Sequence, residues 1–148
     1  MRSFAPILFI VSAGLGACSA FQRASTVPAP AAAEAGTIAQ IYYWRAKPGK
    51  FDEYTRYVRD LAEPIDAEAQ HNGAFISVTT FMTRDTTSAW THMRVFVLRD
   101  STQLREMSGK LDAAGVRLEP DSVKRRLRGE YSATLRDRVG AATVAILR

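Results

Sequence analysis

The stretch that most constrains the fold is residues 37–57, TIAQIYYWRAKPGKFDEYTRY, because it predicts a strand, a tight turn and a helix in direct succession. Its first half, residues 37–46, is rich in β-branched and aromatic side chains, which suit a pleated sheet. The turn KPGK at residues 47–50 ends this strand, since proline lacks a backbone donor and glycine tolerates positive φ. From Phe51 onward, apolar residues recur at helical spacing. The folded part of the chain therefore begins with a strand–turn–helix unit.

The rest of the chain carries further strand and helix signals. In order, they predict a helix over residues 49–70, strands over 74–83 and 89–98 joined by a polar loop at 84–88, a helix over 101–114, a second helix from Pro120, and a final strand over 139–147. This β-α-β-β-α-α-β order is the ferredoxin-like pattern with its second helix split or extended. We expect an α+β fold in which a four-stranded antiparallel sheet carries its helices on one face.

Several local signals refine the helices. Pro64 is expected to kink or end the first part of the first helix, because it removes a helical hydrogen bond. Asp100 is a good N-cap, and Gln103 three residues later completes a capping-box pattern. Gly115 is expected to interrupt the helix that follows. In the last helix, apolar residues recur at near-helical spacing, at Val123, Leu127, Tyr131 and Leu135.

The two-residue period of a strand divides each predicted strand into two faces. One face is aliphatic and is expected to meet the helices, with Ile76, Val78, Thr80, Met82, Met93, Val95, Val97, Val144 and Ile146. The opposite face mixes aromatic and polar residues, namely Gln40, Tyr42, Trp44, Phe75, Ser77, Thr79, Phe81, Trp90, His92, Arg94 and Phe96. Such a face is too aromatic for water and too polar for an ordinary core. We therefore expect a partner sheet to cover it and to enclose a partly polar cavity.

The segment YYWRAKPGKFDEY, the later pair of strands and the final strand together resemble the dimeric α+β barrel superfamily. This superfamily includes antibiotic-biosynthesis-type monooxygenases and NIPSNAP-like proteins. The resemblance covers nearly all of residues 37–148. It implies a homodimer in which two subunits pack their sheets face to face and leave a ligand cavity in each. It implies no particular activity, because this fold serves enzymes and non-enzymes alike.

His92 and Arg94 are the candidate catalytic residues, since both lie on the mixed face of the third strand. An imidazole transfers protons near neutral pH, and a guanidinium holds a carboxylate or phenolate oxygen by paired hydrogen bonds. The candidate ligand-binding residues are their neighbours on the same face, Tyr42, Trp44, Ser77, Thr79, Trp90 and Phe96. These residues suit a small aromatic or anionic molecule.

Three hypotheses follow for the function of the domain. The first is a module that binds such a molecule without transforming it. The second is a cofactor-independent monooxygenase or isomerase, with His92 as acid–base and Arg94 holding the developing oxyanion. The third is a structural dimerisation module, in which His92 and Arg94 bond only to protein groups. The sequence does not decide whether the protein is an enzyme.

Several other site classes are disfavoured. The chain has two histidines and one cysteine, so we predict neither a metal site nor a cofactor. His71 is expected at a helix C-terminus, where its charge favours the helix dipole. The sequence has no phosphate-cradling glycine loop, serine-hydrolase elbow or zincin motif. The basic run at residues 124–128 is expected to be a solvated face, or a contact with anionic lipid headgroups.

Residues 1–17 are interpreted as a bacterial lipoprotein signal peptide, because a short apolar run ends in Leu-Gly-Ala before Cys18. Cys18 would then be the lipidation site, and residues 18–36, rich in Ala and Pro, would tether the domain at residues 37–148. The alternatives are ordinary signal-peptidase cleavage after Ala20 and an uncleaved membrane helix. The resemblance to Gram-negative lipoproteins implies that Ser19 after the cysteine, in place of Asp, directs the protein to the outer membrane, facing the periplasm. This address argues against a nucleic-acid partner.

Overall fold

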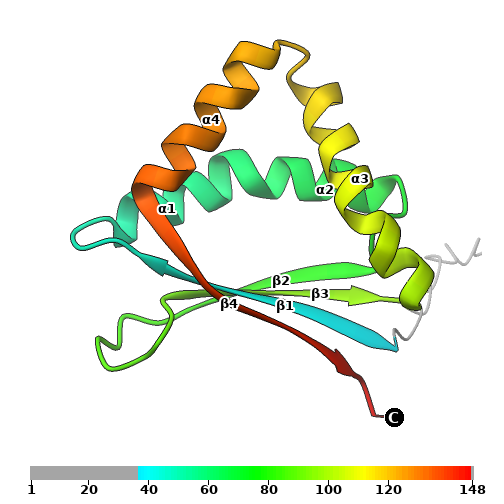
Figure 1. Cartoon of the computed structure of the whole chain (residues 1–148), viewed down its shortest axis with the longest axis horizontal. Coiled ribbons are helices and arrows are strands. Elements are labelled where there is room, and N and C mark those ends of the chain that lie inside the picture. The colour runs from blue at the N-terminus through cyan, green and yellow to red at the C-terminus, as the bar shows by residue number, and fades with distance from the viewer. Residues whose placement is uncertain (1–36, 148) are drawn as a thin grey trace, which may run out of the picture. The chain divides into compact units, whose positions relative to one another are not determined.

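The structure is a computed structural model that describes residues 37–147 (Figure 1). Its elements are β1 (Ile38–Ala46), α1 (Phe51–Tyr57), a π-helical turn (Val58–Ala62), α2 (Glu63–His71), β2 (Ser77–Met82), β3 (His92–Leu98), α3 (Ser101–Leu118), α4 (Ser122–Leu135) and β4 (Arg136–Ala145). The strands form one antiparallel sheet in the order β2-β3-β1-β4, and all helices lie on one side of it (Figure 1). The predicted α+β, ferredoxin-like fold is confirmed.

The turn between β1 and α1 has the geometry that its sequence predicts. Lys50 N donates to Lys47 O at 2.9 Å, and Gly49 has a φ of 73°. A residue with positive φ is strained if it carries a Cβ, and glycine has none. Gly49 therefore allows the chain to reverse sharply at this turn. Helix α1 therefore begins directly at Phe51 and lies across the sheet.

The expected irregularity before Pro64 is a π-helical turn. Pro64 lies in the first turn of α2 and has no N–H to offer the preceding turn. Val58–Ala62 adopts π-helical hydrogen bonding in front of it, and α1 and α2 continue on either side. The helix is thereby continued through the proline rather than ended by it.

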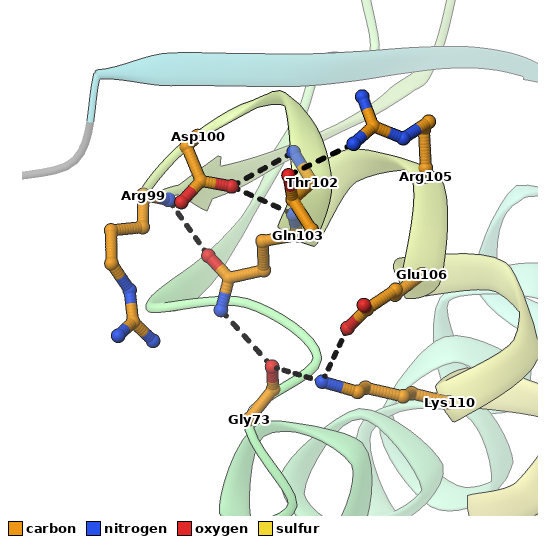
Figure 2. A network of polar contacts seen from close by, with 8 residues as sticks. All are labelled: Gly73, Arg99, Asp100, Thr102, Gln103, Arg105, Glu106 and Lys110. Carbon is orange, nitrogen blue, oxygen red and sulfur yellow. Dashed lines mark hydrogen bonds and ion pairs between the residues drawn. The ribbon is translucent and has the colours of Figure 1, made fainter.

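The N-terminus of α3 is capped as expected, with one difference. Asp100 accepts hydrogen bonds from the N–H groups of Thr102 and Gln103, both at 2.8 Å. The Gln103 side chain accepts from Arg99 N at 2.7 Å and donates to Gly73 O at 3.0 Å (Figure 2). Gln103 thus ties the loop after α2 to the start of α3, instead of closing a capping box on Asp100 itself.

The two predicted boundaries in the late helical segment are wrong. Helix α3 continues through Gly115 to Leu118, because Gly115 is buried and its carbonyl accepts from Glu119 N at 3.0 Å. Helix α4 begins at Ser122, where Asp121 caps it by accepting from Val123 N. Strand β4 begins at Arg136, three residues earlier than expected, and pairs with β1 through a bulge at Tyr43/Trp44.

The predicted orientation of the sheet faces is wrong for β1 and β3. Trp44, Tyr42 and Gln40 pair with His92, Arg94 and Phe96, and this mixed face lies under the helices. The aromatic members join the cores around Phe75, Met107, Tyr54 and Leu135. Among the polar members, His92 and Arg94 find partners on the helices, whereas Gln40 accepts from Thr143 of β4. The aliphatic residues Val95 and Val97 instead face away from the helices, as does Val144 of β4. Only β2 has the expected orientation, since Val78 packs against the core.

Within residues 37–147, none of the helices combines the length and the apolar character needed to cross a bilayer. The predictions for Cys18 and for the segments 1–17 and 18–36 lie outside the described residues.

Candidate functional site

A pocket of about 400 Å³ lies between the helix-facing side of the sheet and α3. Tyr42, Trp44 and Phe96 form its aromatic part, and Met107 and Leu111 of α3 add apolar surface. Its charged residues are Asp66, Arg94, Arg136 and Arg138. Three guanidinium groups face one carboxylate, so the lining carries a net positive charge. This composition suits a small, flat ligand with an anionic group.

Arg94 and Asp66 form an ion pair at the buried end of this pocket. The Arg94 Nη2 and Asp66 Oδ2 atoms are in direct contact, and the two residues are 7% and 4% exposed. Burial lowers the pKa of Arg94 from its ordinary value. The guanidinium also lies over the Phe96 ring, 5.1 Å from its centroid. Arg94 is thus fixed in place by both charge and packing.

Two buried donors beside the pocket lack both a hydrogen-bond partner and an ion-pair partner among residues 37–147, whereas Arg94 Nη2 has its ion-pair contact with Asp66. They are Arg94 Nε and Trp44 Nε1. Buried N–H groups are almost always paired, and leaving one unpaired costs about 1–3 kcal/mol. Both residues line the pocket, so an acceptor bound there could satisfy them.

The other two arginines come from the first residues of β4. Arg136 lies over Trp44 at 4.7 Å from the ring centroid and donates from Nε to Ser132 Oγ at 3.1 Å. Arg138 lies over the Tyr42 ring at 4.8 Å. Because the β1–β4 register shifts at the bulge, Arg138 pairs with Trp44 and both arginines reach the helix-facing side. They hold positive charge directly against the aromatic walls.

His92 is enclosed behind the pocket and does not line it. Thr55 Oγ1 donates to Phe51 O at 2.8 Å, so it can only accept from His92 Nε2 at 3.0 Å. His92 Nδ1 then accepts from Thr91 Oγ1 at 2.9 Å. Burial, and secondarily the Arg136 charge, lowers the pKa of His92 to about 4. The imidazole is therefore neutral near pH 7, with both ring nitrogens occupied.

Tyr54 is a titratable residue in direct contact with His92. Its ring contacts the imidazole with centroids 4.4 Å apart, and burial raises the pKa of its phenol to about 12. The phenol is therefore protonated at physiological pH. Together with His92 it forms an apolar and neutral layer under α1.

The candidate ligand-binding residues separate into two groups. Tyr42, Trp44, Arg94 and Phe96 meet at the pocket, on the helix side of the sheet rather than on its open side. Ser77 and Thr79 pair with Val97 and Val95 on the open face, so the expectation that they flank His92 is wrong. Trp90 precedes β3, and its ring lies 6.3 Å from that of Tyr43, away from the pocket. A role in ligand binding for Ser77, Thr79 and Trp90 stays a prediction that this geometry does not support.

The sequence interpretation missed Asp66, Arg136 and Arg138. Asp66 lies in a predicted helix with many charges, and the two arginines lie between the last apolar position of the predicted helix, Leu135, and the predicted strand over 139–147. The alternation Arg-Asp-Arg-Val at residues 136–139 was the signal available, because it fits a strand with one charged face.

A second pocket, of about 420 Å³, lies among the turn after β1, the loop before β3 and the start of β4. Its cations already bond to protein groups. Arg45 donates to Thr86 O at 3.1 Å, and Arg84 pairs with Asp52. This pocket is therefore less suited to an anion than the first. The part of the chain that the structure describes contains no group of three or more potential metal ligands.

Comparison with known proteins supports the fold alone. No family model and no curated protein sequence matches the chain. Among solved structures, HapK from Hahella chejuensis is similar at 8% identity and a TM-score of 0.52, over 74% of this chain and 92% of that one. PA3566 from Pseudomonas aeruginosa shares 18% sequence identity at a TM-score of 0.50, and the match covers 76% of this chain and 96% of that one. A dimeric ferredoxin-like protein from an uncultured marine organism shares 7% sequence identity at a TM-score of 0.52, and the match covers 78% of this chain and 90% of that one.

Proposed function

We propose that the domain is a binding module for a small, planar, aromatic anion, held in the pocket between the sheet and α3. The observation that carries this proposal is the pair of unpartnered buried donors, Trp44 Nε1 and Arg94 Nε, beside aromatic rings and arginines. A carboxylate or phenolate oxygen would accept from them, and Arg138 would add a charge-assisted bond. The ring of the ligand would stack against Tyr42 or Phe96.

The catalytic alternative, a monooxygenase or isomerase using His92 and Arg94, has less support. Arg94 is suitably placed to hold an oxyanion, but a proton-transfer group is also needed. His92 does not reach the pocket, and its low pKa makes it a poor base at neutral pH. We therefore favour binding over catalysis. The purely structural alternative leaves the unpartnered donors unexplained.

Ligand-induced stabilisation tests the binding proposal. Salicylate at about ten times its Kd should add about 1.4 kcal/mol, which raises the melting temperature by about 4–6 °C. Salicylamide, a neutral analogue of the same shape, should give a much smaller shift. Arg138→Gln should weaken salicylate binding about tenfold, because it removes a charged donor from an exposed site. Arg45→Gln, at the other pocket, is the matched control. Equal shifts with the acid and the amide would contradict the proposal.

We also propose that two copies associate through the open face of the sheet. This face carries Ile41, Tyr43 and Val95, and no helix within residues 37–147 covers it. Apolar faces of this kind are usually buried by a partner, and one of the similar structures is described as dimeric. Sedimentation velocity should show two copies at micromolar concentration, and Val144→Asp should separate them. A single copy at all concentrations would contradict this.

The proposed cellular setting follows from the N-terminal residues alone. We propose that Cys18 is lipidated and that the domain faces the periplasm from the outer membrane, with residues 18–36 as its tether. Metabolic labelling with a palmitate analogue should mark the wild-type chain and not Cys18→Ser. Labelling of both chains, or of neither, would contradict a lipid anchor at this residue.

A further inference from the structure

Helix α4 leaves most of its large apolar residues partly exposed, whereas an ordinary surface helix buries them. Three of its large apolar residues, Val123, Leu127 and Tyr131, are 54%, 51% and 41% exposed, and only Leu135 is buried. Because they are spaced by four residues, the exposed three form one stripe along the helix. We call these three residues the α4 stripe. Leu118, at the end of α3, is also half exposed in the same corner.

The inner side of α4 carries arginines where a core-facing helix would carry apolar residues. Arg125 and Arg128 line the space between α4 and α3. Arg125 donates to the carbonyl groups of Glu119 and Pro120, at 2.8 and 2.7 Å. These bonds fix the turn before α4. Val123 and Leu127 are left about half exposed. Tyr131, in contrast, also packs on α1, where its hydroxyl donates to Glu53 at 2.9 Å and its ring lies 6.0 Å from that of Tyr57.

Basic residues border the α4 stripe. Lys124 and Arg126 are well exposed, and each forms a surface ion pair, with Glu119 at 3.9 Å and with Glu130 at 2.5 Å. Helix α4 nevertheless contains four basic residues against one acidic residue, Glu130. Figure 1 shows that α3 and α4 form an arch whose connection is the part farthest from the sheet. Val123 and Leu127, the two most exposed residues of the α4 stripe, lie in the half of α4 next to this connection.

We propose that α4 docks on an anionic phospholipid surface, with Val123 and Leu127 of the α4 stripe in the interfacial layer and Lys124 and Arg126 among the headgroups. Exposed apolar residues bordered by cations are typical of interfacial helices, and each basic residue near an anionic surface adds about 1 kcal/mol. A second copy is a poorer occupant, because a twofold contact between two stripes would bring their cations together. This proposal is independent of the ligand pocket and of lipidation at Cys18.

Site-specific fluorescence tests the docking on the full chain. In a Cys18→Ser background, Leu127→Cys is labelled with an environment-sensitive dye, and Ala133→Cys, an exposed position off the α4 stripe, serves as the control. Adding phosphatidylglycerol-containing vesicles should shift the emission of the dye at position 127 to the blue, and leave the dye at position 133 nearly unchanged. Because the signal reports the position of the dye, binding by the N-terminal segment alone cannot produce this difference.

The charge requirement is tested with the same label. Lys124→Gln and Arg126→Gln should each weaken partitioning about fivefold, the equivalent of about 1 kcal/mol. Vesicles of phosphatidylcholine alone should give little response. An equal response to neutral and anionic vesicles, or an equal response of the two dyes, would overturn the proposal. A blue shift that grows with protein concentration without vesicles would overturn it too, since it would identify a second copy as the occupant. Circular dichroism confirms that each variant is folded.

Discussion

The Arg94–Asp66 ion pair provides the sharpest test of how the site is built. Removing one partner of a buried pair leaves an uncompensated charge and typically costs about 3–5 kcal/mol. Both residues are more than nine-tenths buried, so Asp66→Asn should lie in this range. A domain of this size is stable by about 5–15 kcal/mol, so the variant should fold but remain weakly stable.

Urea unfolding measures this loss. With a slope of about 1–3 kcal/mol/M, the midpoint for Asp66→Asn should fall by about 2 M. The matched control is Asp52→Asn, which breaks the Arg84–Asp52 pair, where both side chains are more than two-thirds exposed. Exposed pairs contribute about 0–1 kcal/mol, so this variant should change the midpoint only slightly.

A double substitution separates the ion pair from simple packing. Asp66→Leu combined with Arg94→Met replaces both charges by apolar groups, which for buried pairs is often neutral or stabilising. The double variant should therefore recover most of the stability that Asp66→Asn loses. Salicylate should also stabilise Asp66→Asn, because it supplies a replacement carboxylate near Arg94. A loss below about 1 kcal/mol for Asp66→Asn would contradict a buried ion pair between Arg94 and Asp66.

Two further predictions concern groups away from the pocket. The pKa of His92 is about 4 in the folded chain and about 6.5 in the unfolded chain, so between these pH values the unfolded chain binds one more proton. The free energy of unfolding should therefore be highest above pH 6.5. It should fall by at most about 3 kcal/mol as the pH decreases toward 4. NMR titration of the His92 ring checks this, and a midpoint near 6.5 would contradict it. Gly49→Ala should lower the free energy of unfolding by about 1 kcal/mol, because the φ of Gly49 is 73°. Gly129→Ala in α4 should raise it by about 0.5–1 kcal/mol, since alanine favours a helix and a Cβ there meets nothing within 4 Å. Urea unfolding of both variants checks the two signs, and equal signs would contradict the argument.

The elements were predictable because their signals are local. The turn at residues 47–50 and the cap at Asp100 act within four residues, and the element order then leaves few topologies. Boundaries failed where a local signal was too weak to decide. Gly115 lowers helix propensity by only about 1 kcal/mol, and α3 continues through it to Leu118, with the Gly115 carbonyl accepting from Glu119 N.

The orientation of the sheet was not predictable from strand periodicity. Alternation tells which residues share a face, and His92, Arg94 and Phe96 do share one. It does not tell which face the helices cover. That choice depends on partners far along the chain. Asp66 pairs with Arg94 and Thr55 accepts from His92, so these two polar residues lie in the core with partners.

The candidate site was predictable only in part for a related reason. Tyr42, Trp44, Arg94 and Phe96 were identified together and meet at the pocket. Arg136 and Arg138 were missed, because the helical spacing that ends at Leu135 extends naturally across them. Only their pairing with β1 shows that the chain has changed to a strand at this point.

The most direct test of the central claim follows the indole N–H signals during a titration with salicylate. The chain has two tryptophans, so Trp90, outside the pocket, is an internal control for Trp44. We expect the Trp44 Nε1–H resonance to move downfield and saturate as it gains an acceptor, while the Trp90 signal stays in place and salicylamide has little effect. A Trp44 signal that does not move, or that moves equally with the neutral amide, would contradict the claim that this pocket binds an aromatic anion.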